Sequence, residues 1–246
     1  MEIASAWVVP HAPVLVPGLS ARRVDGEPTA KIAPGEVETI ILCSPHGAST
    51  GVYRRASGSL NGFGASGFDR SAVADEELAE KVAASWGRPL LDGPADHGVV
   101  VPLWWLDAGI PVLACTFAEV TGPDSTAADL SATRRAAGDL AEALVDGDRR
   151  RAVAFVASAH LSAGLDPAAP LAELPGARDF DHAVVAALRN EPRRLLDLPL
   201  ESWREAGACG LGPLLTLALL CGIDAGGEVH YSAPFGVGYV TGEIRP

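Results

Sequence analysis

Short apolar segments alternate with segments of helical periodicity along this 246-residue chain. This alternation restricts the fold more than any other feature of the sequence. Apolar runs that indicate buried strands occupy residues 3–9, 39–43, 111–117 and 152–158, and two later strands are expected at 228–231 and 237–244. Helices are expected at residues 75–86, 127–145, 180–188 and 211–221. The pattern predicts a single α/β domain over residues 1–246, in which helices flank a central, mostly parallel or mixed sheet in three layers.

Local signals refine this expectation at two places. Residues 52–68 are rich in glycine and serine, which favours a hairpin or a loop excursion. Asp124 and Ser125 precede the long helical segment and are candidate caps for it.

Composition and charge exclude several classes of protein. Hydrophobic residues make up 48% of the chain, which is enough for a core and too many for a disordered protein. The net charge of −12 and short, dispersed arginine clusters argue against nucleic-acid binding. The sequence shows neither a signal-peptide pattern nor 18 consecutive apolar residues, so we expect a cytoplasmic protein without a membrane segment. Its four cysteines form no C-x-x-C pair, and a disulfide framework is not expected.

Three of the six histidines follow predicted strands directly. His11, His46 and His160 come after residues 3–9, 39–43 and 152–158. The carboxyl ends of parallel strands open onto one crevice, so these rings can converge there. Neutral imidazole is the commonest protein metal ligand, and the spacing therefore indicates a metal site. The alternative for each ring is a structural histidine that is bonded to a backbone carbonyl.

Two further segments are candidates for the same site. His97 follows Asp96, which could orient it, although Asp96 could equally cap a short helix. Cys209 precedes the apolar helix, where a thiolate is stabilised, and Glu205 lies four residues earlier. Either residue could complete a three-ligand set with two histidines. His182 and His230 are expected to be structural or exposed.

These motifs together resemble the superfamily of class III extradiol ring-cleavage dioxygenases (LigB-type) and its Memo-type relatives. The P-H-A motif at His11 and the S-P-H motif at His46 look like the two metal-histidine motifs. The run D-H-G-V-V-V-P-L at 96–103 is similar to the D-H-G-x-x-x-P-L segment of the dioxygenases, and C-G-L-G-P-L at 209–214 is similar to the Memo-type C-G-x-x-P segment. Both branches typically carry S-x-x-L-S-H after the fourth strand. Here that last histidine position is Ala163, and His160 stands three residues earlier.

The resemblance implies a catechol-type aromatic diol and O₂ as substrates, within aromatic compound catabolism. It implies Fe(II) bound by His11, His46 and either Glu205 or Cys209, with His97 and His160 as catalytic acid/base residues. Zinc and copper are the alternative metals, because a cysteine ligand favours softer ions. The alternative function is a Memo-like metal-binding or partner-binding protein without dioxygenase activity. A zinc hydrolase is a third possibility. Superfamily members often form homo-oligomers, and the resemblance implies that state here.

Overall fold

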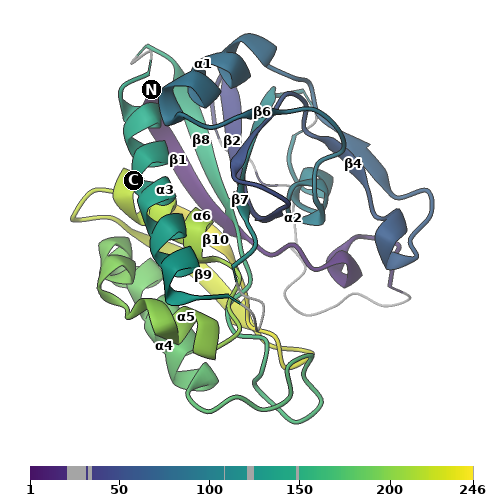
Figure 1. Ribbon diagram of the computed structural model, residues 1–246, viewed down its shortest axis with the longest axis vertical. Helices are drawn as coiled ribbons and strands as arrows, with labels where there is room; N and C mark the ends of the chain where they lie inside the picture. Colours follow the sequence, from purple (N-terminus) through teal and green to yellow (C-terminus); the bar gives the residue numbers. More distant parts are fainter. Residues whose placement is uncertain (21–31, 33–34, 108, 121–124, 148–149, 246) are drawn as a thin grey trace.

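A single eight-stranded sheet forms the centre of the molecule (Figure 1). The structure is a computed structural model, and it describes residues 1–20, 32, 35–107, 109–120, 125–147 and 150–245. The strand order is β6-β3-β7-β2-β8-β1-β10-β9. These strands are β1 (Glu2–Val9), β2 (Thr39–Gly47), β3 (Gly51–Tyr53), β6 (Leu90–Leu91), β7 (Val112–Ala118), β8 (Ala152–Ser158), β9 (Gly226–Ser232) and β10 (Tyr239–Arg245).

The four central strands run parallel to one another. β7 pairs with β2, β2 with β8, and β8 with β1, each in parallel register. The β7–β3, β1–β10 and β10–β9 pairs are antiparallel, so the sheet is mixed. The predicted α/β fold with a mixed sheet flanked by helices is confirmed. Because the central strands share a direction, their carboxyl ends lie at one edge of the sheet.

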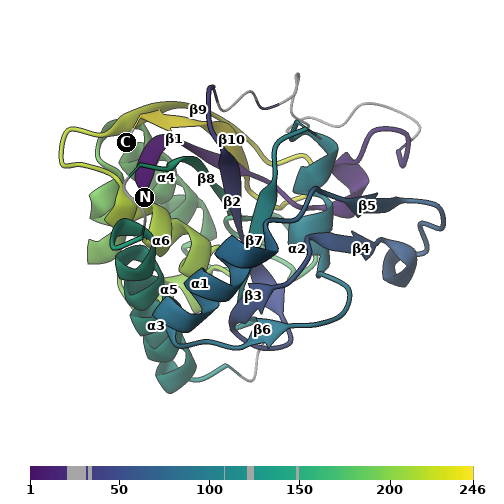
Figure 2. The same ribbon diagram turned by 90° about the horizontal axis from the view of Figure 1, so that it is seen from above.

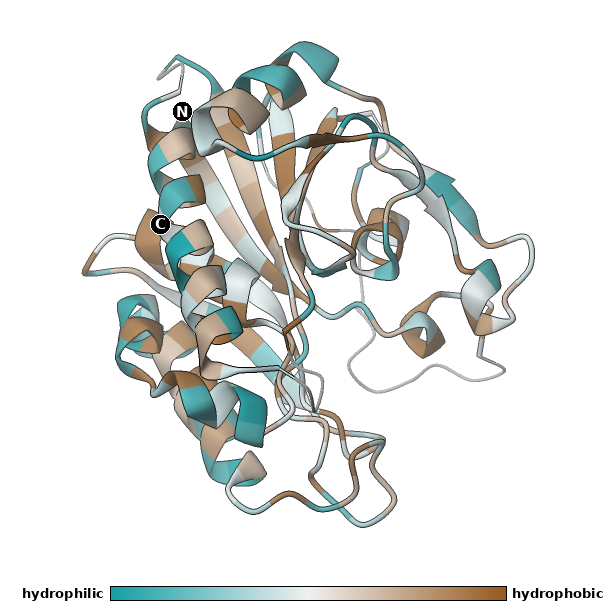
Figure 3. Cartoon of the chain, viewed as in Figure 1, coloured by the Kyte–Doolittle hydropathy of each residue, from teal (hydrophilic) through white to brown (hydrophobic). Residues whose placement is uncertain are grey.

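Alternate residues of the central strands enter two different cores. Ile41 and Cys43 belong to the same core as residues of α1 (Glu76–Trp86), α3 (Ala127–Val145) and α6 (Leu211–Leu220). Ile40 and Leu42 belong to the core on the opposite face. Strands that are buried on both faces read as continuous apolar runs, which is why the sequence shows them so clearly. Figure 3 shows these hydrophobic residues along the sheet, with hydrophilic residues on the outer sides of the helices.

The two layers around the sheet are built differently (Figure 2). One face carries five helices: α1 (Glu76–Trp86), α3 (Ala127–Val145), α4 (Ala177–Asn190), α5 (Leu200–Glu205) and α6 (Leu211–Leu220). The other face is covered by short α2 (His97–Val100), 3₁₀ turns and the two-stranded hairpin of β4 (Ser57–Ser59) and β5 (Asp69–Ser71). The hairpin expected within residues 52–68 is therefore present and ends slightly later. No helix within the described part of the chain has the length and apolarity needed to cross a bilayer.

Most predicted elements are found within a few residues of their expected bounds. The helix predicted at 127–145 is confirmed at both ends, whereas β2 extends four residues further than expected and includes His46. The cap prediction for α3 was wrong: Thr126 accepts a hydrogen bond from the Asp129 backbone N–H and forms a capping box with that residue. Asp124 lies outside the described residues. All four cysteines are free and buried, as expected without a disulfide framework.

Candidate functional site

The three strand-end histidines meet at the carboxyl edge of the parallel strands. β8 lies between β1 and β2, so the residues after these strands are neighbours. The ring centroids of His11 and His46 are 4.7 Å apart, and those of His11 and His160 are 3.8 Å apart with the rings stacked. The convergence predicted from the sequence is confirmed, and it follows from the parallel pairing of the strands.

Three side chains in this cluster could hold one metal ion: His11, His46 and Cys209. The Nε2 atoms of the two histidines are 2.9 Å apart, and Cys209 Sγ lies 3.4 Å from His11 Nε2. All three donor atoms lie within 4.8 Å of one another. His11 is fully buried and Cys209 is 8% exposed, so the donors are held inside the protein.

Glu205 does not belong to this group. It ends α5 on the surface, in an exposed position beside Ser202 and Asp179. After α5 the chain turns at Gly207, whose φ of 64° is left-handed, and this turn leads Cys209 inward. Of the two third-ligand candidates, the structure therefore brings only Cys209 to the histidines.

His11 and His46 each have a partner at the ring nitrogen that faces away from Cys209. His11 Nδ1 lies 2.9 Å from Ser158 Oγ, and this hydroxyl donates to the Gly98 carbonyl at 2.6 Å. His46 Nδ1 lies 3.5 Å from the half-exposed carboxylate of Glu119, which directly follows β7. Ser158 and Glu119 were not predicted as site residues. Glu119 follows a predicted strand at the same sheet edge, and the rule that found the histidines would have found it.

His11 and His46 differ in charge. Burial lowers the pKa of His11 well below its ordinary value, and the neighbouring histidines add to this effect, so the ring is neutral at pH 7. Burial also disfavours the charged form of His46. However, its contacts with Cys209 and Glu119 outweigh burial and raise its pKa to about 10. His46 is therefore the protonated histidine of this pair, and it faces the Glu119 carboxylate.

His97 lies beside the donors without being one of them. Its ring stacks on His46 with centroids 4.3 Å apart, and Phe63 packs against its other side at 4.8 Å. Burial, followed by the charge of His46, lowers the pKa of His97 to about 4. Among the described residues no group forms a hydrogen bond to its ring. His97 is therefore a neutral imidazole at pH 7.

One ring nitrogen of His160 accepts a hydrogen bond from the backbone. Its Nε2 accepts a hydrogen bond from the His11 backbone N–H at 3.1 Å, and Tyr239 packs against its ring at 5.1 Å. Burial and the charges of His46 and His97 lower its pKa well below the ordinary value. Because Nε2 acts as the acceptor, the proton of the neutral ring lies on Nδ1. His160 thus supports the loop of His11, and only Nδ1 remains for proton exchange.

Asp96 connects three strands to the helix that begins with His97. Its carboxylate caps α2 by accepting from the Gly98 backbone N–H at 2.9 Å, as expected for an N-cap. The same carboxylate accepts from three hydroxyls, those of Ser44, Tyr53 and Thr116. Ser44 in turn accepts from the His46 backbone N–H at 3.2 Å. The network therefore links α2 to the strand that carries His46, and the sequence pattern did not reveal it.

Glycines follow His46 and His97 because neighbouring groups approach the backbone closely. A Cβ atom on Gly47 would lie 2.5 Å from Thr116 Oγ1, and one on Gly98 would overlap the Ser44 hydroxyl. Both contacts belong to the hydrogen-bonded network around Asp96. Any larger residue at Gly47 or Gly98 would thus displace a side chain of this network.

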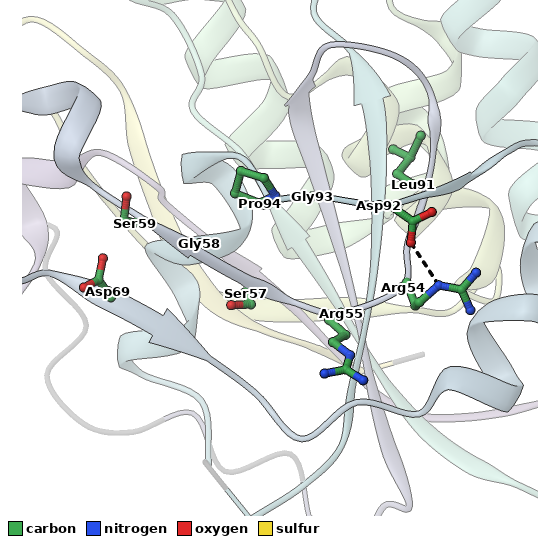
Figure 4. A pocket seen from close by; sticks show the side chains of 10 residues that line it. All are labelled: Arg54, Arg55, Ser57, Gly58, Ser59, Asp69, Leu91, Asp92, Gly93 and Pro94. Carbon is green, nitrogen blue, oxygen red and sulfur yellow. Dashed lines mark hydrogen bonds and ion pairs between the residues drawn. The ribbon is translucent and has the colours of Figure 1, made fainter.

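A separate surface pocket of about 600 Å³ lies beside the β4–β5 hairpin (Figure 4). Its two arginines are already paired, Arg54 with Asp92 and Glu80, and Arg55 with Glu76. The pocket shares no lining residue with the histidine cluster. We therefore place the candidate functional site at the cluster.

No protein-family model matches this chain, and no curated protein matches it. The resemblance to the LigB-type and Memo-type families accordingly depends on the motifs quoted above, and the function is a proposal.

Proposed function

We propose that this chain is a metal-dependent protein of the extradiol dioxygenase type, with its metal held by His11, His46 and Cys209. The observation that carries the proposal is the convergence of these three donor atoms within 4.8 Å. They come from separate parts of the chain, which local sequence effects do not bring together. Two donors are the imidazole nitrogens that metals commonly bind in proteins.

The separations between the donor atoms suit a shared ion. Ligand atoms that each lie about 2.0–2.3 Å from one metal are roughly 3–4 Å from one another. The observed separations of 2.9 and 3.4 Å are close to this range. Three protein ligands leave coordination positions open, as catalytic metal sites require.

The surrounding side chains supply proton transfer for a diol substrate. Fe(II) held by His11, His46 and Cys209 would supply the electron chemistry that O₂ requires. His97 takes a proton from a diol hydroxyl and returns it later, since its ring is neutral and has no other described partner. His160 can take part through Nδ1 alone, because Nε2 accepts from His11. Phe63 packs on His97 and restricts how that ring can turn.

Metal analysis followed by a substrate screen tests this proposal. We expect elemental mass spectrometry to find roughly one metal ion per chain after purification without chelator or added metal. Protein loaded with Fe(II) under anaerobic conditions and then exposed to air should convert a simple catechol into a coloured ring-cleavage product. Iron-loaded protein that leaves every tested catechol unchanged would contradict the dioxygenase activity while leaving metal binding intact.

A Memo-like metal-binding protein without dioxygenase activity is the second candidate. It is favoured by Cys209, rather than Glu205, as the third donor and by alanine at position 163. A thiolate ligand favours zinc or copper(I) over the harder Fe(II).

Cys209→Ser separates the two candidates. The change exchanges a soft donor for a hard one at the same position. For a site built for a soft metal we expect zinc affinity to fall roughly 100-fold, with Fe(II) binding affected less. Competition with a chromophoric chelator measures both affinities. Equal zinc affinities of wild type and variant would remove the support for the Memo-like alternative.

A further inference from the structure

Two side chains outside the donor set contact the histidine nitrogens that face away from the metal position. Ser158 is fully buried at the end of β8, and its hydroxyl lies 2.9 Å from His11 Nδ1. Glu119 follows β7, and its carboxylate lies 3.5 Å from His46 Nδ1. Each histidine therefore has a partner at the nitrogen that faces away from the metal position. The partner is a neutral hydroxyl for His11 and a charged carboxylate for His46.

The hydrogen bonds of Ser158 fix which nitrogen of His11 carries the proton. A serine hydroxyl has one proton to donate. Ser158 donates it to the Gly98 carbonyl at 2.6 Å, since a carbonyl can only accept. Its contact with His11 must therefore run from Nδ1–H to Oγ, which leaves a lone pair on Nε2. That lone pair points toward His46 Nε2 and Cys209 Sγ.

Glu119 selects a nitrogen of His46 in a different way. Its carboxylate forms an ion pair with protonated His46, and an ionised carboxylate only accepts, so Nδ1 keeps its proton toward Glu119. Nε2 is then the nitrogen that faces the metal position and gives up its proton when an ion binds. The other contacts that the described residues make with His46 are the backbone bond to Ser44, the Nε2 contact with His11, the interaction with Cys209 and the ring stack with His97.

We propose that Ser158 and Glu119 are the positioning residues of this metal site, which hold both histidines as Nδ1–H tautomers with Nε2 toward the ion. The proposal depends on the proposed metal site. Metal-ligating histidines commonly donate their second N–H to a carboxylate, a carbonyl or a hydroxyl-type acceptor, and losing that partner weakens metal binding. The two partners differ. Buried Ser158 orients His11 through a hydrogen bond of fixed direction, whereas half-exposed Glu119 orients His46 through an ion pair.

Zinc affinities of matched variants test the two roles. For Ser158→Ala and Glu119→Ala we expect zinc binding to weaken roughly 10- to 100-fold in a chelator competition. Glu119→Gln should lose less, because its amide oxygen still accepts from Nδ1–H. The controls are Ser232→Ala, a buried serine whose hydroxyl has no described partner, and Glu142→Gln, an exposed carboxylate on α3. Both controls should bind zinc as the wild type does.

The ¹⁵N chemical shifts of the His11 ring in metal-free protein provide a readout that needs no metal. They should show Nδ1–H in the wild type and a mixture of tautomers in Ser158→Ala. Failure of the wild type to bind zinc would contradict the metal site, and the tautomer would still decide the role of Ser158. An Nε2–H tautomer in the wild type, or unchanged zinc affinity in both alanine variants, would overturn the positioning role.

Discussion

Replacing His46 with alanine is expected to remove metal binding from this protein. The variant keeps only His11 and Cys209 as donors from the group of three. Apparent binding free energies of four-ligand structural zinc sites are roughly 10–16 kcal/mol, so one ligand contributes about 3 kcal/mol. A loss of this size weakens affinity about 100-fold or more. Metal content after purification should therefore fall from the wild-type value to background.

His46 is the better position for this test than His11. Only 12% of the His46 side chain is exposed, but its ring lies at the edge of the site, whereas His11 is fully enclosed. Truncation of His46 thus leaves less of a cavity in the core. The matched control is His182→Ala, which removes an exposed histidine on α4. Equal metal content and affinity in His46→Ala and His182→Ala would show that the cluster is not the binding site.

The sequence could predict that the site lies at the carboxyl edge of the sheet, because one rule places its histidines there. Parallel strands end together, and His11, His46 and His160 each follow an apolar run that is recognisable without structure. The choice between Glu205 and Cys209 could not be predicted. Both precede α6 by a few residues, and only the turn at Gly207 determines which one faces inward.

The partners of Asp96 were also beyond sequence reasoning. Tyr53 lies on β3 and Thr116 on β7, and their hydroxyls reach Asp96 only after the sheet has formed. Hydroxyl residues are common in strands, so nothing local distinguishes these two. His160 illustrates the same limit. Its position after a strand indicated a metal site, and the family resemblance implied a catalytic role. Its Nε2 also accepts a hydrogen bond from the His11 backbone N–H, a contact that sequence cannot show.

Replacing Asp96 with alanine is expected to destabilise the protein by about 3–5 kcal/mol, because four donors lose a common acceptor. Three of these donors are the hydroxyls of Ser44, Tyr53 and Thr116, and the fourth is the Gly98 backbone N–H. The loss is less than the sum of four bonds because Asp96 is only partly buried and water can replace some of them. Urea denaturation followed by circular dichroism measures the change in the free energy of unfolding.

Asp92→Ala is the matched control for this prediction. Asp92 lies four residues earlier, its side chain is 79% exposed, and its ion pair with Arg54 is on the surface. Exposed pairs of this kind contribute under about 1 kcal/mol. If Asp96→Ala destabilises the protein no more than Asp92→Ala does, the four hydrogen bonds to Asp96 contribute little to the stability of the fold.

Asp96→Asn tests whether the charge or the shape of this side chain holds the network. The amide oxygen can replace Oδ1 and accept from Ser44 and Gly98, but the amide nitrogen would face the Tyr53 and Thr116 hydroxyls. Thr116 has a second acceptor, the Ser44 carbonyl at 3.4 Å, so its hydroxyl can turn away. We therefore expect a loss of stability between those of Asp92→Ala and Asp96→Ala. Because Ser44 also holds the His46 backbone, zinc affinity should fall in the same order as stability.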